Sequence, residues 1–258
     1  NAELGRTVWK EKISMTVGEA EGLGKQAYYG IQSYIATWIG DTKIREPREG
    51  KTLVSPEALE ELHAKLQPGD ILLERRNWFL SNAFLPGYWP HAALYAGTPE
   101  DLQRLGLDKD PRVAKHWERY ARADAEGHPH VIVEALSEGV TFASLQHSIG
   151  GGDAVAILRP RLPPEAIRQA IAEGFSHAGK PYDFEFDFFS TDKIVCTELV
   201  YRAYSELPGK PGVHFPVVDV MGRKTLPAIE MVRKFANERG KPGAELEFIA
   251  FIDGDGVG

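Results

Sequence analysis

The chain contains one cysteine, Cys196, and its setting favours a thiol that acts as a nucleophile. It lies in the segment KIVCTELVYRAY, where the apolar residues after it recur at helical spacing: Leu199, Val200, Ala203 and Tyr204. We therefore expect Cys196 at or near a helix N-terminus, where unpaired N–H groups and the helix dipole lower the pKa of a thiol. A free cysteine is also a common small residue of buried cores, and this second interpretation stays open at this point.

A thiol nucleophile needs a base, and histidine is the usual one because it titrates near neutral pH. Among the eight histidines, His91 differs because it opens the apolar segment HAALYAG directly after Trp89-Pro90. A polar side chain at the mouth of a strand, beside an aromatic loop, can face a cleft. The alternative is a hydrogen-bonded histidine at the end of an ordinary strand.

A third candidate, Glu134, interrupts VIVEAL, a segment that is otherwise apolar on both faces. Burying a carboxylate is costly unless a partner compensates for the lost water. A histidine on the adjacent strand would compensate Glu134 and would itself be oriented by it. The alternative is a glutamate on the solvent face of an edge strand. A thiol at a helix start, a histidine on one strand and a carboxylate on the next form a coherent set for acyl transfer.

Other motifs are weaker. His128 and His130 form an HxH pair without a third or fourth ligand at suitable spacing, so we predict no metal site and no cofactor. The run Gly150-Gly151-Gly152 lacks the Lys and Ser/Thr that follow in a phosphate-binding loop. The aromatic segment 77–90, which includes Tyr88 and Trp89, could pack a long connection or could form an apolar wall for a bulky substrate.

The composition is that of an ordinary globular protein and limits the classes of partner. The net charge of −7 and the pI near 5.7 argue against a nucleic-acid-binding protein, which usually carries a basic face. No apolar run approaches the ~20 residues that a membrane-spanning helix needs.

The helices and strands that must position these residues do not alternate regularly along the chain. We expect helices over 17–39, from Pro56 to about 66, from Pro164, from about Cys196, and over 225–239. We expect strands over 69–76, 91–97, 130–136, 140–145, 153–160 and 245–253. Because the strands follow one another with few helical crossovers, we predict an α+β fold with a small antiparallel sheet or partial barrel packed against helices.

The expected order of helices and strands also suggests how the chain is divided into domains. Residues 1–66 are expected to form an N-terminal helical region packed on the core, and residues 67–258 a catalytic domain. Residues 98–129 interrupt two strands with a polar, partly helical segment, which we interpret as a surface insertion that could overhang a site.

The chain resembles the circularly permuted NlpC/P60 papain-like cysteine hydrolases of the YiiX/YebB-like type. The matching segments are PGDILL (68–73), PHAALYAG (90–97), VIVEA (131–135), GKPYDFEFD (179–187) and VCTELVYRAY (195–204). They follow one another in order over most of residues 68–206, and together they are fairly specific. The histidine precedes the cysteine, as the permuted arrangement requires.

This resemblance implies a Cys–His–polar triad, with Cys196 as nucleophile, His91 as general base and acid, and Glu134 in the third position. Tyr182, in the matched PYD segment, could donate to an oxyanion or shape the cleft, or it could be a core tyrosine. Tyr88 and Trp89 are further candidates for substrate binding. Asp70 and Glu198 also match the pattern, but we expect structural roles for both, in a turn and in the first turn of a helix.

The implied activity is a cysteine hydrolase that cleaves an amide bond through an acyl-thioester, with a cell-wall peptide as one substrate. Two alternatives remain: a hydrolase or acyltransferase acting on lipid esters or amides, and a non-catalytic binding module with the same fold. The resemblance also suggests an exported or cell-envelope-associated bacterial protein, associated with the cell wall or a membrane surface. It leaves the oligomeric state unknown.

Overall fold

The computed structural model describes residues 54–75, 89–150, 152–184, 188, 191–220, 223–253 and 256–257. Three of the expected features lie wholly or mostly outside these ranges. They are the N-terminal helical region 1–66 up to residue 53, the helix over 17–39 within it, and most of the aromatic segment 77–90, including Tyr88.

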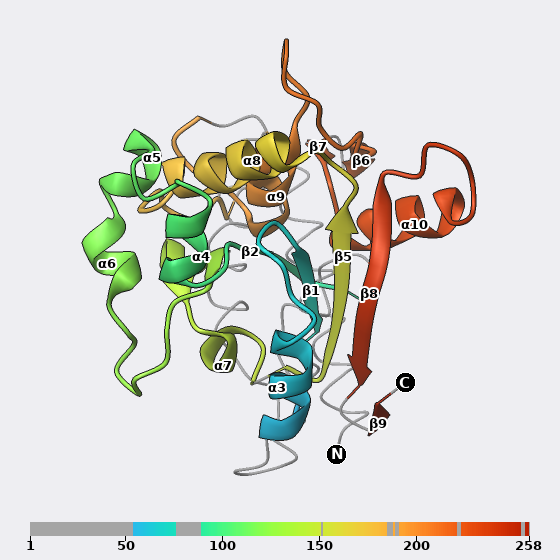
Figure 1. Ribbon diagram of the computed structural model, residues 1–258. Helices are drawn as coiled ribbons and strands as arrows, with labels where there is room; N and C mark the ends of the chain where they lie inside the picture. The colour runs from blue at the N-terminus through green and yellow to red at the C-terminus, as the bar shows by residue number, and fades with distance from the viewer. Residues whose placement is uncertain are drawn as a thin grey trace, which may run out of the picture.

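A seven-stranded sheet in the order β4-β3-β2-β1-β5-β8-β9 forms the centre of the fold, and every neighbouring pair is antiparallel (Figure 1). Its strands are β1 (Ile71–Arg75), β2 (His91–Tyr95), β3 (Ile132–Leu136), β4 (Gly139–Ala143), β5 (Ala154–Pro160), β8 (Leu246–Asp253) and β9 (Gly256–Val257). A separate hairpin joins β6 (Val218–Val220) to β7 (Arg223–Thr225). With helices on both faces of this sheet, the predicted α+β class is confirmed.

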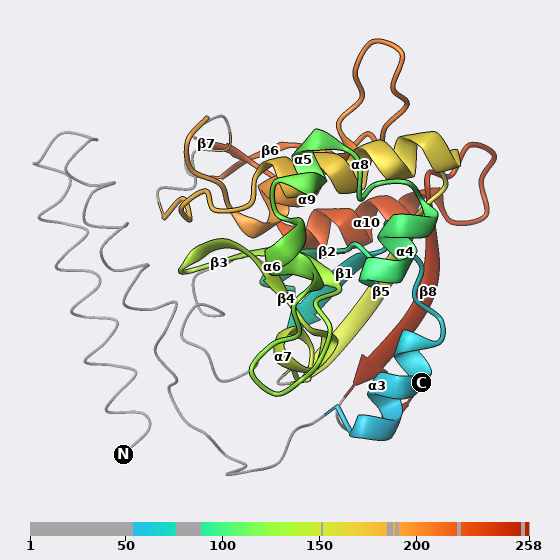
Figure 2. The same ribbon diagram turned by 60° about the vertical axis from the view of Figure 1, so that its left-hand side comes forward.

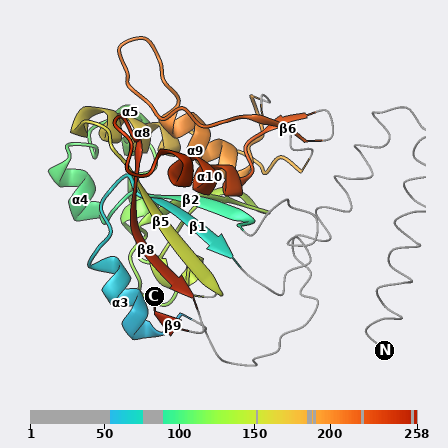
Figure 3. The same ribbon diagram turned by 90° about the vertical axis from the view of Figure 1, so that its right-hand side faces the viewer.

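The two faces of the sheet carry different sets of helices (Figures 2 and 3). One face carries α8 (Pro164–Ser176), α9 (Cys196–Tyr204) and α10 (Ala228–Glu238), and the other carries α3 (Pro56–His63) and α7 (Leu145–Ser148). The alternation of strand side chains explains both layers. In β1, Ile71 and Leu73 pack in the cluster with α9 and α10, whereas Leu72 packs in the cluster with α3. No helix in the described ranges is long and apolar enough to cross a membrane.

Residues 98–129 hold three short helices: α4 (Pro99–Arg104), α5 (Pro111–Ala114) and α6 (Trp117–Ala121). The segment is polar in composition, yet Leu102, Val113 and Tyr120 are fully buried and pack with Phe175 of α8. The rings of Tyr120 and Phe175 meet edge to face at 4.8 Å. In sequence these few apolar residues are surrounded by Arg, Asp and Lys, and in the fold they pack the segment against the helical layer.

Asp70 closes the turn that leads into β1, as the sequence analysis expected. Its carboxylate accepts from the backbone N–H of Gln67 at 2.8 Å and from two guanidinium nitrogens of Arg159 at 2.7 Å each. Asp70 is fully buried, so these donors stand in place of water around its charge, and burial still raises the pKa of its carboxyl.

Asp70→Asn is predicted to lower the free energy of unfolding by about 2 kcal/mol, because it removes a charge-assisted bidentate contact from a buried site. Urea denaturation measures the effect. The exposed Glu100 provides a matched control, since Glu100→Gln should change stability by less than about 0.5 kcal/mol. Equal effects of the two substitutions would contradict the structural role of Asp70.

Candidate active site

Cys196 is the first residue of α9, as its spacing to the following apolar residues predicted. Val195 before it is extended, and the helix buries Leu199, Val200, Ala203 and Tyr204 along one side. Cys196 is buried, and the backbone N–H of Thr197 in the first helical turn bonds its sulfur. The helix start therefore supports an anion at this sulfur.

His91 is the first residue of β2 and lies beside Cys196. The sulfur of Cys196 is 4.0 Å from the carbonyl oxygen of Pro90, hydrogen-bonds the imidazole of His91, and accepts from the backbone N–H of Ala92. The backbone around the strand start thus brings the thiol and the imidazole into contact. The imidazole of His91 keeps 18% of its surface exposed, whereas Cys196 is buried.

Glu134 lies on β3, in the strand next to β2, and is fully buried. Its Oε2 is 2.8 Å from Nε2 of His91, which leaves Nδ1 of the ring for the sulfur. Tyr95 of β2 faces Ile132 of β3, and by alternation His91 and Glu134 share one sheet face with that pair. The sheet register therefore brings together two side chains that are 43 residues apart.

The same carboxylate oxygen has a second partner that the sequence analysis missed. The hydroxyl of Ser148, at the end of α7, donates to Oε2 of Glu134 at 3.1 Å. Both side chains are buried. Ser148 thus fixes Glu134, which in turn fixes His91, so two hydrogen bonds connect α7 to the imidazole.

Thiol and imidazole shift each other's ionisation. Burial opposes protonation of His91, but the negative charges of Cys196 and Glu134, with their hydrogen bonds, raise its pKa well above the ordinary value. Burial likewise opposes ionisation of Cys196, but the facing imidazolium and the N–H groups of Ala92 and Thr197 lower the pKa of the thiol. Both shifts therefore favour the thiolate–imidazolium pair over the neutral pair.

Tyr182 lies at the site as well. An isolated bridge to Ile194 holds its backbone beside the segment that leads into α9, and its hydroxyl hydrogen-bonds Cys196. Burial, and next the charge at Cys196, raise the pKa of Tyr182 well above its ordinary value. The phenol stays protonated and can donate a hydrogen bond toward the sulfur.

Glu198 stabilises the start of the same helix. Its carboxylate accepts from the backbone N–H of Val195 at 3.4 Å and pairs with Arg202 at 2.6 Å, one turn further along. Burial raises the pKa of Glu198 to about 7, and Arg202 opposes that shift. This geometry agrees with the structural role expected from the sequence.

The remaining predicted residues are less central. The indole of Trp89 is buried in the core cluster and meets the ring of Phe251 edge to face at 6.1 Å. Its surroundings match the packing interpretation of the aromatic segment, while its part in substrate binding stays a prediction. Tyr88 lies outside the described residues.

One group of side chains in the described ranges has the spacing of a metal site. Ligand atoms of Asp124, Glu126 and His128 come within 4.8 Å of one another in a surface loop. Asp124 accepts from the backbone N–H groups of Glu126 and His128 at 2.9 Å each, so it already closes this turn. His130 turns away and places Nδ1 3.2 Å from the carbonyl oxygen of Tyr120. The loop's own hydrogen bonds account for the arrangement.

Ser148→Ala is predicted to lower kcat roughly tenfold and to leave KM unchanged, because Ser148 contacts Glu134 rather than a substrate. A tenfold loss corresponds to about 1.4 kcal/mol, the size of one hydrogen bond to a charged group. Steady-state kinetics of purified protein measure both parameters. Ser176→Ala, which removes a hydroxyl from the end of α8, is the matched control and should change neither. An unaltered kcat in Ser148→Ala would contradict the positioning role.

A family model described as permuted papain-like amidase enzyme, YaeF/YiiX, C92 family, matches residues 65–240, which is more than half of the chain. The matched range contains Cys196, His91 and Glu134. Comparisons with curated proteins and with solved structures found no match.

Proposed function

The chain belongs to the permuted papain-like amidase family, and on this premise we propose that Cys196, His91 and Glu134 are the catalytic triad of a thiol hydrolase. Family membership supports cysteine amidase or peptidase chemistry in general. One observation carries the specific assignment: the only thiol of the chain hydrogen-bonds an imidazole whose other nitrogen is 2.8 Å from a buried carboxylate. Nucleophile, base and orienting group thus stand in the order that acyl transfer requires.

The first half of the reaction forms an acyl-enzyme. The Cys196 thiolate attacks the carbonyl carbon of the substrate, and the electron pair of the C=O bond moves onto oxygen. Tyr182 and the backbone N–H groups at the start of α9 are the donors that would hold this oxyanion. One such donor typically lowers the barrier by ~3–4 kcal/mol. His91 then gives its proton to the leaving amine as the C–N bond breaks.

The second half releases the acyl group. His91, now neutral, takes a proton from water, and the resulting hydroxide equivalent attacks the thioester carbon. The C–S bond breaks, the carboxylic acid leaves, and the proton on His91 restores the ion pair with the thiolate. Glu134 keeps the ring in place and stabilises its positive form throughout both halves.

The substrate we propose is an amide bond in a peptide, with a cell-wall peptide as the first candidate. A second candidate is an ester or amide of a lipid, cleaved or transferred by the same thioester chemistry. The aromatic surroundings support this second candidate, because Tyr182 hydrogen-bonds the thiol and its ring lies 5.0 Å from that of Phe184, so that these rings could contact an acyl chain.

Intact-protein mass spectrometry during turnover tests the proposal. Because Cys196 is the only cysteine, a thioester adduct can form at one residue only, and Cys196→Ala must carry none. We expect an acyl adduct with a stem-peptide amide and a kcat/KM at least tenfold above that for a lipid ester, about 1.4 kcal/mol of transition-state discrimination. The reverse ratio would favour the lipid candidate. No adduct and no turnover with either substrate would support a binding module instead.

A further inference from the structure

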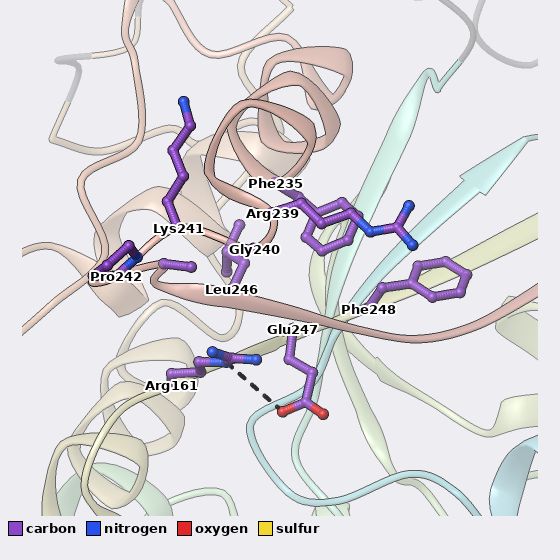
Figure 4. A pocket seen from close by; sticks show the side chains of 10 residues that line it. Arg161, Phe235, Arg239, Gly240, Lys241, Pro242, Leu246, Glu247 and Phe248 are labelled. Atoms are coloured by element: carbon purple, nitrogen blue, oxygen red, sulfur yellow. Dashed lines mark ion pairs between the residues drawn. The ribbon is translucent and has the colours of Figure 1, made fainter.

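The described surface has a basic, partly apolar pocket on the flank of the sheet, between α10 and the start of β8. It has a volume of about 680 Å³. Six side chains of this α10–β8 patch carry the argument: Arg161, Phe235, Arg239, Lys241, Leu246 and Phe248 (Figure 4). From its charge and its exposed aromatic ring we propose that the patch docks on the surface of an anionic lipid bilayer.

The apolar part of the patch is open to solvent. Phe248 keeps 46% of its surface exposed, and only Leu207 joins it as an exposed large hydrophobic residue in the described ranges. Its ring lies 6.0 Å from that of Phe235 on α10, and Figure 4 shows the two rings on the same flank. Phe235 is half-buried against the core and supports the exposed ring of Phe248, which can enter the boundary between headgroups and acyl chains.

The charged part of the patch is positive on an acidic protein. Arg239 and Lys241 are exposed, and neither forms an ion pair with any acid in the described ranges. Arg161 is held only loosely, 3.9 Å from Glu247. The chain as a whole carries a net charge of −7, so an anionic surface repels most of the molecule and attracts this patch.

The edge position of β8 makes the patch accessible. β9 pairs with β8 only at Ile252 and Asp253, so no described strand covers β8 beside Phe248. The patch also lies far from the triad, because two strands separate β8 from β2. A row of directly paired residues crosses these strands from β2 to β8: His91, Glu74, Val155 and Ile252. Phe248 is four residues before Ile252, which places it roughly 20 Å from His91. Docking here leaves the triad free.

Co-sedimentation with lipid vesicles tests the docking surface. The protein is mixed with vesicles of phosphatidylcholine alone or of phosphatidylcholine with phosphatidylglycerol, at low and at physiological salt. Each exposed Lys or Arg near an anionic surface strengthens binding about fivefold. We therefore expect binding to the anionic vesicles only, weakened at least tenfold in Arg239→Glu/Lys241→Glu and also weakened in Phe248→Ser.

The matched control is Lys109→Glu/Lys115→Glu, which changes the net charge equally at exposed positions of the 98–129 segment. It should bind anionic vesicles as the unmodified protein does, and circular dichroism checks that every variant is folded. Equal loss in the two double variants would overturn the proposal, as would absence of binding by the unmodified protein or equal binding to both kinds of vesicle. Amidase activity does not enter the measurement, so this test is independent of the proposed triad.

Discussion

Replacing Cys196 by alanine should lower kcat/KM for amide cleavage by at least about 10⁴-fold, because it removes the only atom that can form the thioester. The residual rate would come from substrate binding and from the oxyanion donors alone. The substitution removes one sulfur at the start of α9 and should leave the fold intact. Steady-state kinetics and circular dichroism measure the two outcomes.

Cys196→Ser provides the matched comparison. A hydroxyl fits the same place, but its pKa is far too high for an ion pair with His91, so we expect its activity to be close to that of the alanine variant. Substantial turnover by either variant would remove Cys196 from the mechanism. No second thiol in the chain could take over its role.

Glu134→Gln should lower kcat/KM by about 10²–10⁴-fold while keeping the size of the side chain. The negative charge of Glu134 helps to raise the pKa of His91, and the imidazolium helps to lower the pKa of Cys196. Activity requires pH above the thiol pKa and below the imidazole pKa. Loss of the Glu134 charge lowers the pKa of His91, which moves the alkaline limb of the pH–rate profile to lower pH. The weaker imidazolium raises the pKa of Cys196, which moves the acidic limb to higher pH, so the range of active pH becomes narrower.

The pH dependence of kcat/KM from acid to alkaline conditions checks this prediction. Glu138→Gln, which removes a carboxylate from the exposed β3–β4 turn, serves as the control and should alter neither rate nor profile. If Glu134→Gln lost activity while the acidic and the alkaline limbs of the pH–rate profile stayed at the same pH, the carboxylate would act on folding rather than on the ion pair.

Most of the sheet could be predicted from sequence because its strands are bounded by turns and filled with apolar residues. The expected strand over 91–97 is β2, His91–Tyr95, and the expected strand over 153–160 is β5, Ala154–Pro160. The helix from Cys196 follows the 3.6-residue period closely, and even its first residue is as expected. The burial cost of a carboxylate in an apolar strand likewise pointed to Glu134 and its histidine partner.

Features that depend on contacts distant in sequence were missed. The hairpin of β6 and β7 has three residues in each strand, too few for a period to stand out. Ser148 ends a four-residue helix, and its bond to Glu134 becomes visible only when α7 folds over the sheet. Tyr182, by contrast, was already a candidate through the matched PYD segment, and its bridge to Ile194 holds it beside the segment that leads into α9.

Ultraviolet titration of the thiolate tests the central assignment most directly, since a single cysteine gives a single signal. The absorbance of the thiolate is followed against pH in the unmodified protein and in His91→Ala, with Cys196→Ala as the blank. We predict a thiolate that persists below the ordinary pKa of a thiol in the unmodified protein, and an apparent pKa that rises in His91→Ala. Identical titrations with an ordinary or higher pKa would contradict the ion pair and, with it, the proposed catalytic centre.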